Sequence, residues 1–139
     1  MRVLADTCVI VDVLQNREPF CKSAKALFLA VANNEIDGFI SAKSVTDIYY
    51  LTHRLTHSID SSREILKKLL SLFKVLDTSA LDCRNALSSP VTDYEDAVMC
   101  ETAERCGVDF IVTRNIKDYK NSKVKSLTPD ELLTLINAE

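Results

Sequence analysis

Glycine, tryptophan and long apolar runs are scarce in this chain of 139 residues, which has two glycines and no tryptophan. Nucleotide-binding P-loops, dinucleotide-binding turns and serine-hydrolase elbows need glycines at fixed spacings, and the sequence has none of these patterns. Apolar runs such as Val9–Val11 are far shorter than the ~18 residues of a membrane span. The first apolar run stops at Asp6, too early for a signal peptide. The sequence therefore predicts a cytoplasmic protein without membrane contact.

The cysteine count and the net charge exclude further classes of protein. The chain has five cysteines, an odd number, and no C-x-x-C spacing. This pattern argues against a disulfide framework and against a zinc knuckle, so we expect buried free thiols in a reducing compartment. The formal net charge is −3. Because the chain is not basic overall, any nucleic-acid binding requires a local basic patch.

Short apolar runs alternate with segments of helical periodicity. Strands are expected at residues 2–5, 39–40, 73–76, 109–113 and 123–127, with helices at 7–14, 18–32, 41–56, 78–87 and 92–107. The capping boxes Ser61-x-x-Glu64 and Thr92-x-x-Glu95 are expected to open helices, and Thr128-Pro129 the last one. The alternation predicts an α/β fold, a single domain over residues 1–139 built as a three-layer α/β/α sandwich around a mostly parallel sheet.

One acid lies where the helix over residues 92–107 should face the core. At ~100° per residue, one apolar stripe is formed by Met99, Cys100, Ala103 and Cys106. Asp96 falls in the middle of this stripe, whereas the helix macrodipole explains Asp93 adequately. An unpaired buried carboxylate is costly, so such groups pair, protonate or bind a metal. We therefore favour a ligand role for Asp96 over a structural one.

Two further acids stand at comparable places. Asp6 follows the first apolar strand directly, and Asp47 lies at the margin of a helix face formed by Ile48, Leu51 and Leu55. Each has a structural alternative, Asp6 as a helix N-cap and Asp47 as an exposed acid. Parallel sheets bind ligands beyond the carboxyl ends of their strands. Acids from three elements in one pocket would repel one another, and the cation they require fits Mg²⁺ or Mn²⁺.

Four segments together resemble the PIN domain, the nuclease fold of VapC-type toxins. In chain order they are Leu4–Thr7, Ser44–Asp47, Asp93–Ala97 and Val112–Tyr119. The resemblance extends from residue 2 to about residue 127. It implies an α/β sandwich with acids gathered at the carboxyl edge of its sheet, and cleavage of RNA that depends on Mg²⁺ or Mn²⁺.

The resemblance also implies roles for individual residues. Asp6, Asp47 and Asp96 correspond to the catalytic acids and metal ligands, and Asn115 stands where many members have a fourth acid. Supporting roles fall to Thr7, Asp93, Thr113 and Asp118. The chain departs from the family where Asp47 replaces the usual glutamate and where Asn115 is neutral. Both departures weaken the attraction for a second metal ion.

A basic segment follows the last motif. It carries five bases against the single acid Asp118, namely Arg114, Lys117, Lys120, Lys123 and Lys125. A solvated loop is the plain interpretation, but next to the predicted site we expect Arg114, Lys117 and Lys120 to bind RNA phosphates. Tyr119 would either stack on an unpaired base or fill the core.

Other interpretations and partners stay open. His53 and His57 have the spacing of a helical metal pair, but both project away from the apolar face of their helix, which favours surface residues. A PIN-like scaffold that binds RNA or a protein without cutting is the main rival to a toxin endoribonuclease. The resemblance implies a cognate antitoxin and a homodimer. Dimerisation also fits the apolar excess on one helix, carried by Ile65, Leu66, Leu69, Leu70 and Leu72.

Overall fold

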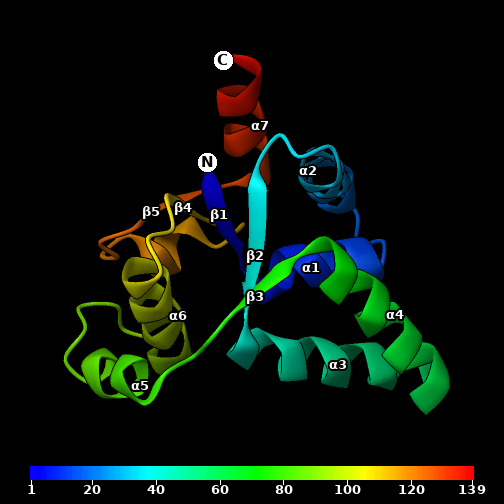
Figure 1. Ribbon diagram of the computed structural model, residues 1–139, viewed down its shortest axis with the longest axis horizontal. Helices are drawn as coiled ribbons and strands as arrows, with labels where there is room; N and C mark the ends of the chain where they lie inside the picture. Colours follow the sequence, from blue (N-terminus) through cyan, green and yellow to red (C-terminus); the bar gives the residue numbers. More distant parts are fainter.

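Five strands form a single sheet in the computed structural model, which describes residues 1–139 (Figure 1). They are β1 (Arg2–Ala5), β2 (Asp37–Ser41), β3 (Lys74–Leu76), β4 (Phe110–Val112) and β5 (Lys125–Leu127). Their spatial order is β3-β2-β1-β4-β5, and each neighbouring pair is parallel. The predicted sheet is confirmed, and it is parallel throughout.

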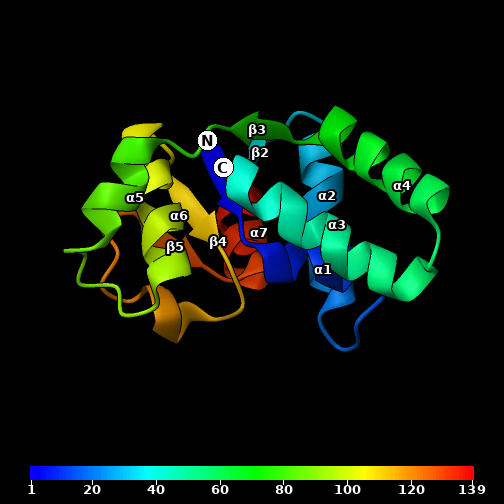
Figure 2. The same ribbon diagram turned by 90° about the horizontal axis from the view of Figure 1, so that it is seen from below.

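Helices cover both faces of this sheet, which confirms the three-layer α/β/α sandwich. One face packs against α1 (Thr7–Leu14), α2 (Cys21–Ala32), α3 (Ala42–Thr56), α4 (Ile59–Leu72) and α7 (Pro129–Asn137). The other face packs against α5 (Ala80–Ala86), α6 (Tyr94–Arg105) and the short 3₁₀ helix η1 (Ile116–Tyr119). Figures 1 and 2 both place α5 and α6 on one side of the strands and α1 to α4 on the other.

The central strand β1 is buried on both faces. Val3 and Ala5 belong to the core beneath α1 and α2, whereas Leu4 belongs to the core beneath α6. This explains why the strand is apolar without alternation. The neighbouring strand β2 approaches α2 so closely that a Cβ on Gly38 would lie 2.6 Å from Val31 Cγ2. Glycine at this position is therefore required by close packing of helix on sheet.

Two helix starts differ from the prediction. α4 begins after Ser58, whose side chain accepts the backbone N–H of Ser61, so the capping box predicted to start at Ser61 is wrong. α6 begins after Asp93, which caps it in place of Thr92. In both cases another side chain oxygen satisfies the free N–H groups of the first turn. The helix start predicted at Thr128-Pro129 is confirmed, and Thr128 and Glu131 form a capping box there.

The cysteines are all free, as predicted. Cys21 and Cys100 are buried, but Cys83 is exposed on α5, so the expectation of buried thiols holds only in part. None of the helices combines the length and the apolar character needed to cross a bilayer.

The direction of strand succession reverses between β1 and β4. From β1, the sheet grows to β2 and β3 on one side and to β4 and β5 on the other. Ala5 pairs with Val112 in the register of β1 and β4, so Asp6 and Thr113 follow neighbouring strand ends. Figure 2 views this carboxyl edge from below, with α6 on one side and α1 and α3 on the other. Open parallel sheets bind their ligands at such a reversal.

Candidate functional site

Asp6 occupies the carboxyl end of β1 and is only 9% exposed. Its backbone N–H donates to the Val112 carbonyl at 2.9 Å. Thr113 Oγ1, at the end of β4, donates to Asp6 Oδ2 at 2.8 Å. Asp6 is the N-cap residue of α1, yet its side chain makes no capping hydrogen bond. The carboxylate is therefore fixed by the neighbouring strand end and not used up in capping.

Asp96 lies in the first turn of α6, on the other side of the sheet edge. The hydroxyl of Tyr119 donates to Asp96 Oδ1 at 3.1 Å. Burial raises the pKa of Asp96 to about 6, against the effect of the Tyr119 hydrogen bond, and the negative charges of Asp93, Asp6 and Asp118 add to the rise. Asp96 thus sits in a surplus of negative charge that favours either protonation or a cation.

Asp47 lies on α3 and already has a cationic partner. Lys43 Nζ is 2.8 Å from Asp47 Oδ2 and 2.9 Å from Glu95 Oε2 of α6. The lysine thereby bridges α3 and α6 across the mouth of the site. Its side chain is 28% exposed, and the pKa of Lys43 is raised by both carboxylates, although desolvation opposes this.

Asp6, Asp47 and Asp96 line one cavity of about 300 Å³, hereafter the acidic cavity. Its other lining residues are Thr7, Lys43, Tyr50, Leu51, Glu95 and Met99. One lysine faces four carboxylates there, and hard oxygen donors with excess negative charge fit a divalent cation such as Mg²⁺ or Mn²⁺. No three acidic, histidine or cysteine side chains are already close enough to hold one ion together. The donor chemistry fits a metal, and Asp6, Asp47 and Asp96 are the residues that would hold it.

The remaining predicted residues are distributed around this cavity. Asn115 is exposed and does not line it; its backbone N–H donates to Thr113 Oγ1 at 3.0 Å. Asp93 and Asp118 line an adjacent cavity of about 480 Å³, hereafter the lysine cavity. Its lining residues are Val91, Thr92, Asp93, Tyr94, Lys117, Asp118, Lys120 and Asn121. Lys117 and Lys120 therefore lie together near the start of α6, beside the carboxylates of Asp93 and Asp118.

Comparison with known proteins identifies the family to which the chain belongs. A family model described as the PIN domain matches residues 2–117. The chain belongs to the PIN domain family. No curated protein matches it.

Solved structures resemble this PIN domain closely in fold and distantly in sequence. VapBC2 from Rickettsia felis, bound to a promoter DNA fragment, is 19% identical with a TM-score of 0.67, over 92% of this chain and 98% of that one. A toxin–antitoxin complex from Klebsiella pneumoniae is 22% identical with a TM-score of 0.66, over 91% and 97%. VapC20 from Mycobacterium tuberculosis, a toxin that cleaves the sarcin–ricin loop, is 13% identical with a TM-score of 0.62, over 78% and 86%.

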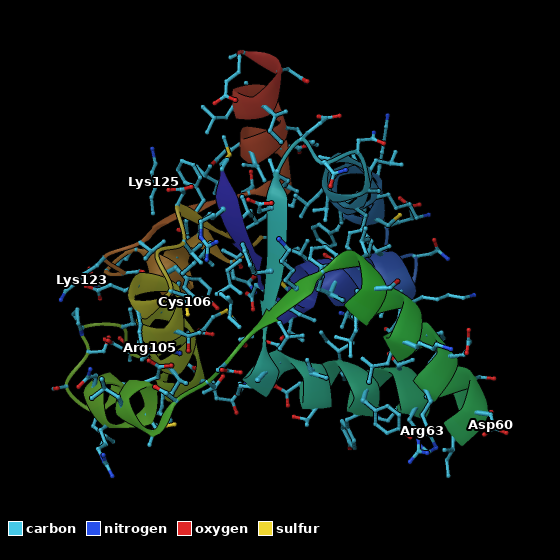
Figure 3. All side chains as sticks on the ribbon, in the orientation of Figure 1. Asp60, Arg63, Arg105, Cys106, Lys123 and Lys125 are labelled. Atoms are coloured by element: carbon cyan, nitrogen blue, oxygen red, sulfur yellow. The ribbon has the colours of Figure 1, made fainter.

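Two residues of the predicted basic track have other roles in this PIN domain. Arg114 pairs with buried Asp12 of α1 at 2.7 Å and stacks over Phe20, 4.2 Å from its ring centroid. Because its guanidinium already pairs with a buried carboxylate, Arg114 is a poor phosphate ligand. Tyr119 is 2% exposed and donates a hydrogen bond to Asp96. Of the two roles expected for it, the structure shows that the ring fills the core beneath α6. Lys123 and Lys125 point outward at the β5 edge (Figure 3).

Sequence reasoning missed three residues of the acidic cavity. Lys43 precedes Asp47 by four residues, and this i, i+4 spacing was the signal for an ion pair on one helix face. Glu95 accepts a hydrogen bond from the same lysine although the two residues are 52 positions apart in the sequence. No local sequence pattern predicts such a contact. Tyr50 lies one residue before Leu51 on α3.

The prediction that Leu55 is buried is wrong, since it is 61% exposed, and α3 therefore presents apolar surface to solvent beyond the cavity.

Cys8 lies next to the fixed carboxylate of Asp6. Its Sγ is 3.5 Å from Asp6 Oδ2 and 3.8 Å from Thr113 Oγ1. Burial, reinforced by the charge of Asp6, raises the pKa of the Cys8 thiol to about 11. The thiol is therefore neutral near neutral pH and acts as a weak donor to Asp6.

Proposed function

We propose that residues 1–139 form a single nuclease domain that hydrolyses RNA phosphodiester bonds internally with Mg²⁺ or Mn²⁺. The observation that carries this proposal is the acidic cavity, where Asp6, Asp47 and Asp96 from three separate elements line one space at the reversal of strand order. Membership of the PIN domain family supports it, as does the sarcin–ricin-loop cleavage ascribed to VapC20.

The chain's own residues prepare this chemistry. A divalent cation, when bound, makes water more acidic and stabilises charge on phosphoryl oxygens. Thr113 orients Asp6, and Tyr119 orients Asp96. Thr7 lines the cavity beside them. Because water and not the ribose 2′-hydroxyl attacks, the products carry a 5′-phosphate and a 3′-hydroxyl; a 2′,3′-cyclic phosphate would refute this route.

A digest of end-labelled RNA tests the proposal. Cleavage is expected with Mn²⁺ or Mg²⁺ and its loss with EDTA. The variants Asp6→Asn and Asp96→Asn, purified in parallel, are expected to lose it and so exclude a contaminating nuclease. Cleavage that persists equally in both variants contradicts the proposed site.

A second candidate function is a PIN-domain scaffold that binds RNA or a protein without cutting. The contacts of Lys43 favour it, because its ammonium already partners Asp47 and Glu95 at 2.8 and 2.9 Å. Neutral Asn115 adds no charge to compensate. RNA binding by the wild-type protein with no cleavage in any metal would select this function.

We further propose that the protein is a cytoplasmic toxin with a cognate antitoxin, and that it forms a homodimer. The structural neighbours from Rickettsia felis and Klebsiella pneumoniae, both complexes of such systems, support the antitoxin. Growth arrest on expression of the wild-type chain, absent with Asp96→Asn, is the expected result. Light scattering of the purified protein tests the dimer.

A further inference from the structure

A second cavity adjoins the acidic cavity along α3. It has a volume of about 260 Å³ and is lined by Gln15, Arg17, Leu51, Arg54 and Leu55; we call it the arginine cavity. Leu51 lines both cavities, so they share one wall. The two cavities are therefore neighbours on either side of Leu51.

One face of α3 connects the two cavities. Asp47, Tyr50, Leu51 and Arg54 are spaced at i, i+3, i+4 and i+7, which places them in a row on the same side of the helix. From Asp47 to Arg54 this row spans ~10 Å along the helix axis. It begins at a carboxylate of the proposed nuclease site and ends at a cation.

Tyr50 presents a flat aromatic surface at the mouth of the acidic cavity. It lines that cavity and is 62% exposed. The guanidinium carbon of Arg54 lies over this ring, 5.7 Å from its centroid, and the Tyr50 side chain is still largely exposed to solvent. An exposed ring beside a cation is the arrangement with which proteins stack an unpaired base and hold its phosphate.

The arginines of this surface have no carboxylate partner. Neither Arg17 nor Arg54 takes part in a salt bridge. Gln15 Oε1 accepts two hydrogen bonds from the Arg17 guanidinium, at 2.9 and 3.2 Å, and Gln15 Nε2 donates to the Leu51 carbonyl of α3 at 3.3 Å. Arg17 is thus held beside α3 while its charge stays available, in a chain whose net charge is −3.

We propose that Tyr50, Arg54 and Arg17 form a subsite for single-stranded RNA next to the cleavage site. A base stacks on the Tyr50 ring, and the adjoining phosphates bind the two guanidinium groups. The subsite rests on the proposed function, because RNA held in the acidic cavity is what places a nucleotide over Tyr50. It selects an unpaired strand, since the bases of a duplex are stacked on one another and cannot lie on the ring.

Equilibrium binding separates this subsite from catalysis. A fluorescently labelled single-stranded RNA is titrated with the 139-residue chain in EDTA, where metal-dependent cleavage is off, and anisotropy gives the Kd. Tyr50→Ala and Tyr50→Leu are each expected to weaken binding about tenfold, because neither keeps a flat ring. Tyr50→Phe and Tyr50→Trp are expected to bind like the wild type.

The arginines are tested in the same assay. Arg54→Gln and Arg17→Gln are each expected to weaken binding and to lower the magnitude of the salt slope of log K by about 0.7. Arg84→Gln is the matched control, because Arg84 is exposed on α5, on the opposite face of the sheet, and lines neither cavity.

The outcomes distinguish the subsite from the nuclease. If Tyr50→Ala and Arg54→Gln both bind RNA with the wild-type Kd, the subsite is overturned, even if the wild type cuts RNA. The surface would then be available to bind a protein partner. Ring-dependent binding without cleavage in any metal supports the subsite and rejects the nuclease. A wild-type protein that binds no RNA in EDTA and cleaves none in any metal overturns both.

Discussion

The protonation of Asp96 is expected to affect the stability of the fold. Its pKa in the folded protein is about 6, above the ~4 of an unperturbed aspartate. A raised pKa means that the folded state prefers the protonated acid, so this contribution is complete below about pH 4 and is lost as pH rises through about 6. Without metal, wild-type stability should therefore fall between about pH 4 and pH 7 on account of this side chain.

Asp96→Asn tests this dependence. In EDTA, its free energy of unfolding is expected to exceed that of the wild type by about 2 kcal/mol near neutral pH, and the difference is expected to vanish near pH 4. Urea denaturation followed by circular dichroism at several pH values measures it. Glu35→Gln, at an exposed turn acid, is the control and should show no such trend. A variant less stable than the wild type near neutral pH would contradict the assignment.

Lys43 is expected to weaken the attraction of the acidic cavity for a metal ion. Its ammonium lies within 3 Å of both Asp47 and Glu95, and a cation at this position repels a second cation nearby. Lys43→Met is expected to tighten Mn²⁺ binding about tenfold, as measured by isothermal titration calorimetry on the RNA-free protein. Lys67→Met, at an exposed position of α4, should leave the affinity unchanged. Weaker Mn²⁺ binding by Lys43→Met would mean that the lysine holds Asp47 in place.

At the level of elements, α5 and α6 are joined through one buried acid. Asp82 of α5 is 2% exposed as a side chain and accepts hydrogen bonds from Arg105 and Thr102 of α6. Its other role is in the capping box that starts at Ser79. Although burial alone raises the pKa of Asp82, the hydrogen bonds, that from Arg105 first, lower it to about 2. This connection fixes the helix that carries Asp96.

Asp82→Asn removes the charge of that connection. A lowered pKa contributes stability that is present above about pH 4 and lost as pH falls through about 2. The variant is therefore expected to lose about 2 kcal/mol near neutral pH and less near pH 3, measured by urea denaturation at both values. Cys83→Ala, at an exposed position of the same helix, is expected to behave as wild type. Equal losses at both pH values would point to packing and not to charge.

Local sequence signals predicted the order of elements but not the contacts between them. Buried strands such as β1 can be predicted because both of their faces are apolar. The start of α7 can be predicted because Thr128 and Pro129 are adjacent in the sequence. Ser58 and Ser61 are equally good caps by residue type, so position alone could not decide between them. The basic segment predicts that Arg114 binds RNA, because its partner Asp12 is 102 residues away and the ion pair leaves no local signal. Ion pairs between distant parts of the chain determine which basic side chains have no carboxylate partner. The spacing of residues in the sequence does not reveal these pairs.

At the scale of the whole molecule, charge is segregated although the total is −3. The acidic cavity has a neighbour on each side. Asp93, just before α6, lines the lysine cavity, and residues of α3 line the arginine cavity. Carboxylates concentrate at the reversal of strand order. The arginine cavity beside them carries two cations and no acid, whereas the lysine cavity combines Lys117 and Lys120 with Asp93 and Asp118. Such an arrangement repels a phosphate chain at its centre unless a cation is bound, while the two arginines attract the chain along α3. RNA binding and metal binding should therefore reinforce each other.

The salt dependence of RNA binding measures this flanking charge. For a single strand, each phosphate contact adds about 0.7 to the magnitude of the slope of log K against log salt, so changing both Lys117 and Lys120 to Ala is expected to lower it by about 1.4. Anisotropy titrations over a series of salt concentrations give the slope. The double variant Lys67→Ala, Lys68→Ala removes two exposed lysines of α4 that line none of the three cavities, and it should keep the wild-type slope. If both pairs change the slope equally, attraction is due to net charge alone; if Lys117 and Lys120 leave it unchanged, the strand leaves the acidic cavity only along α3.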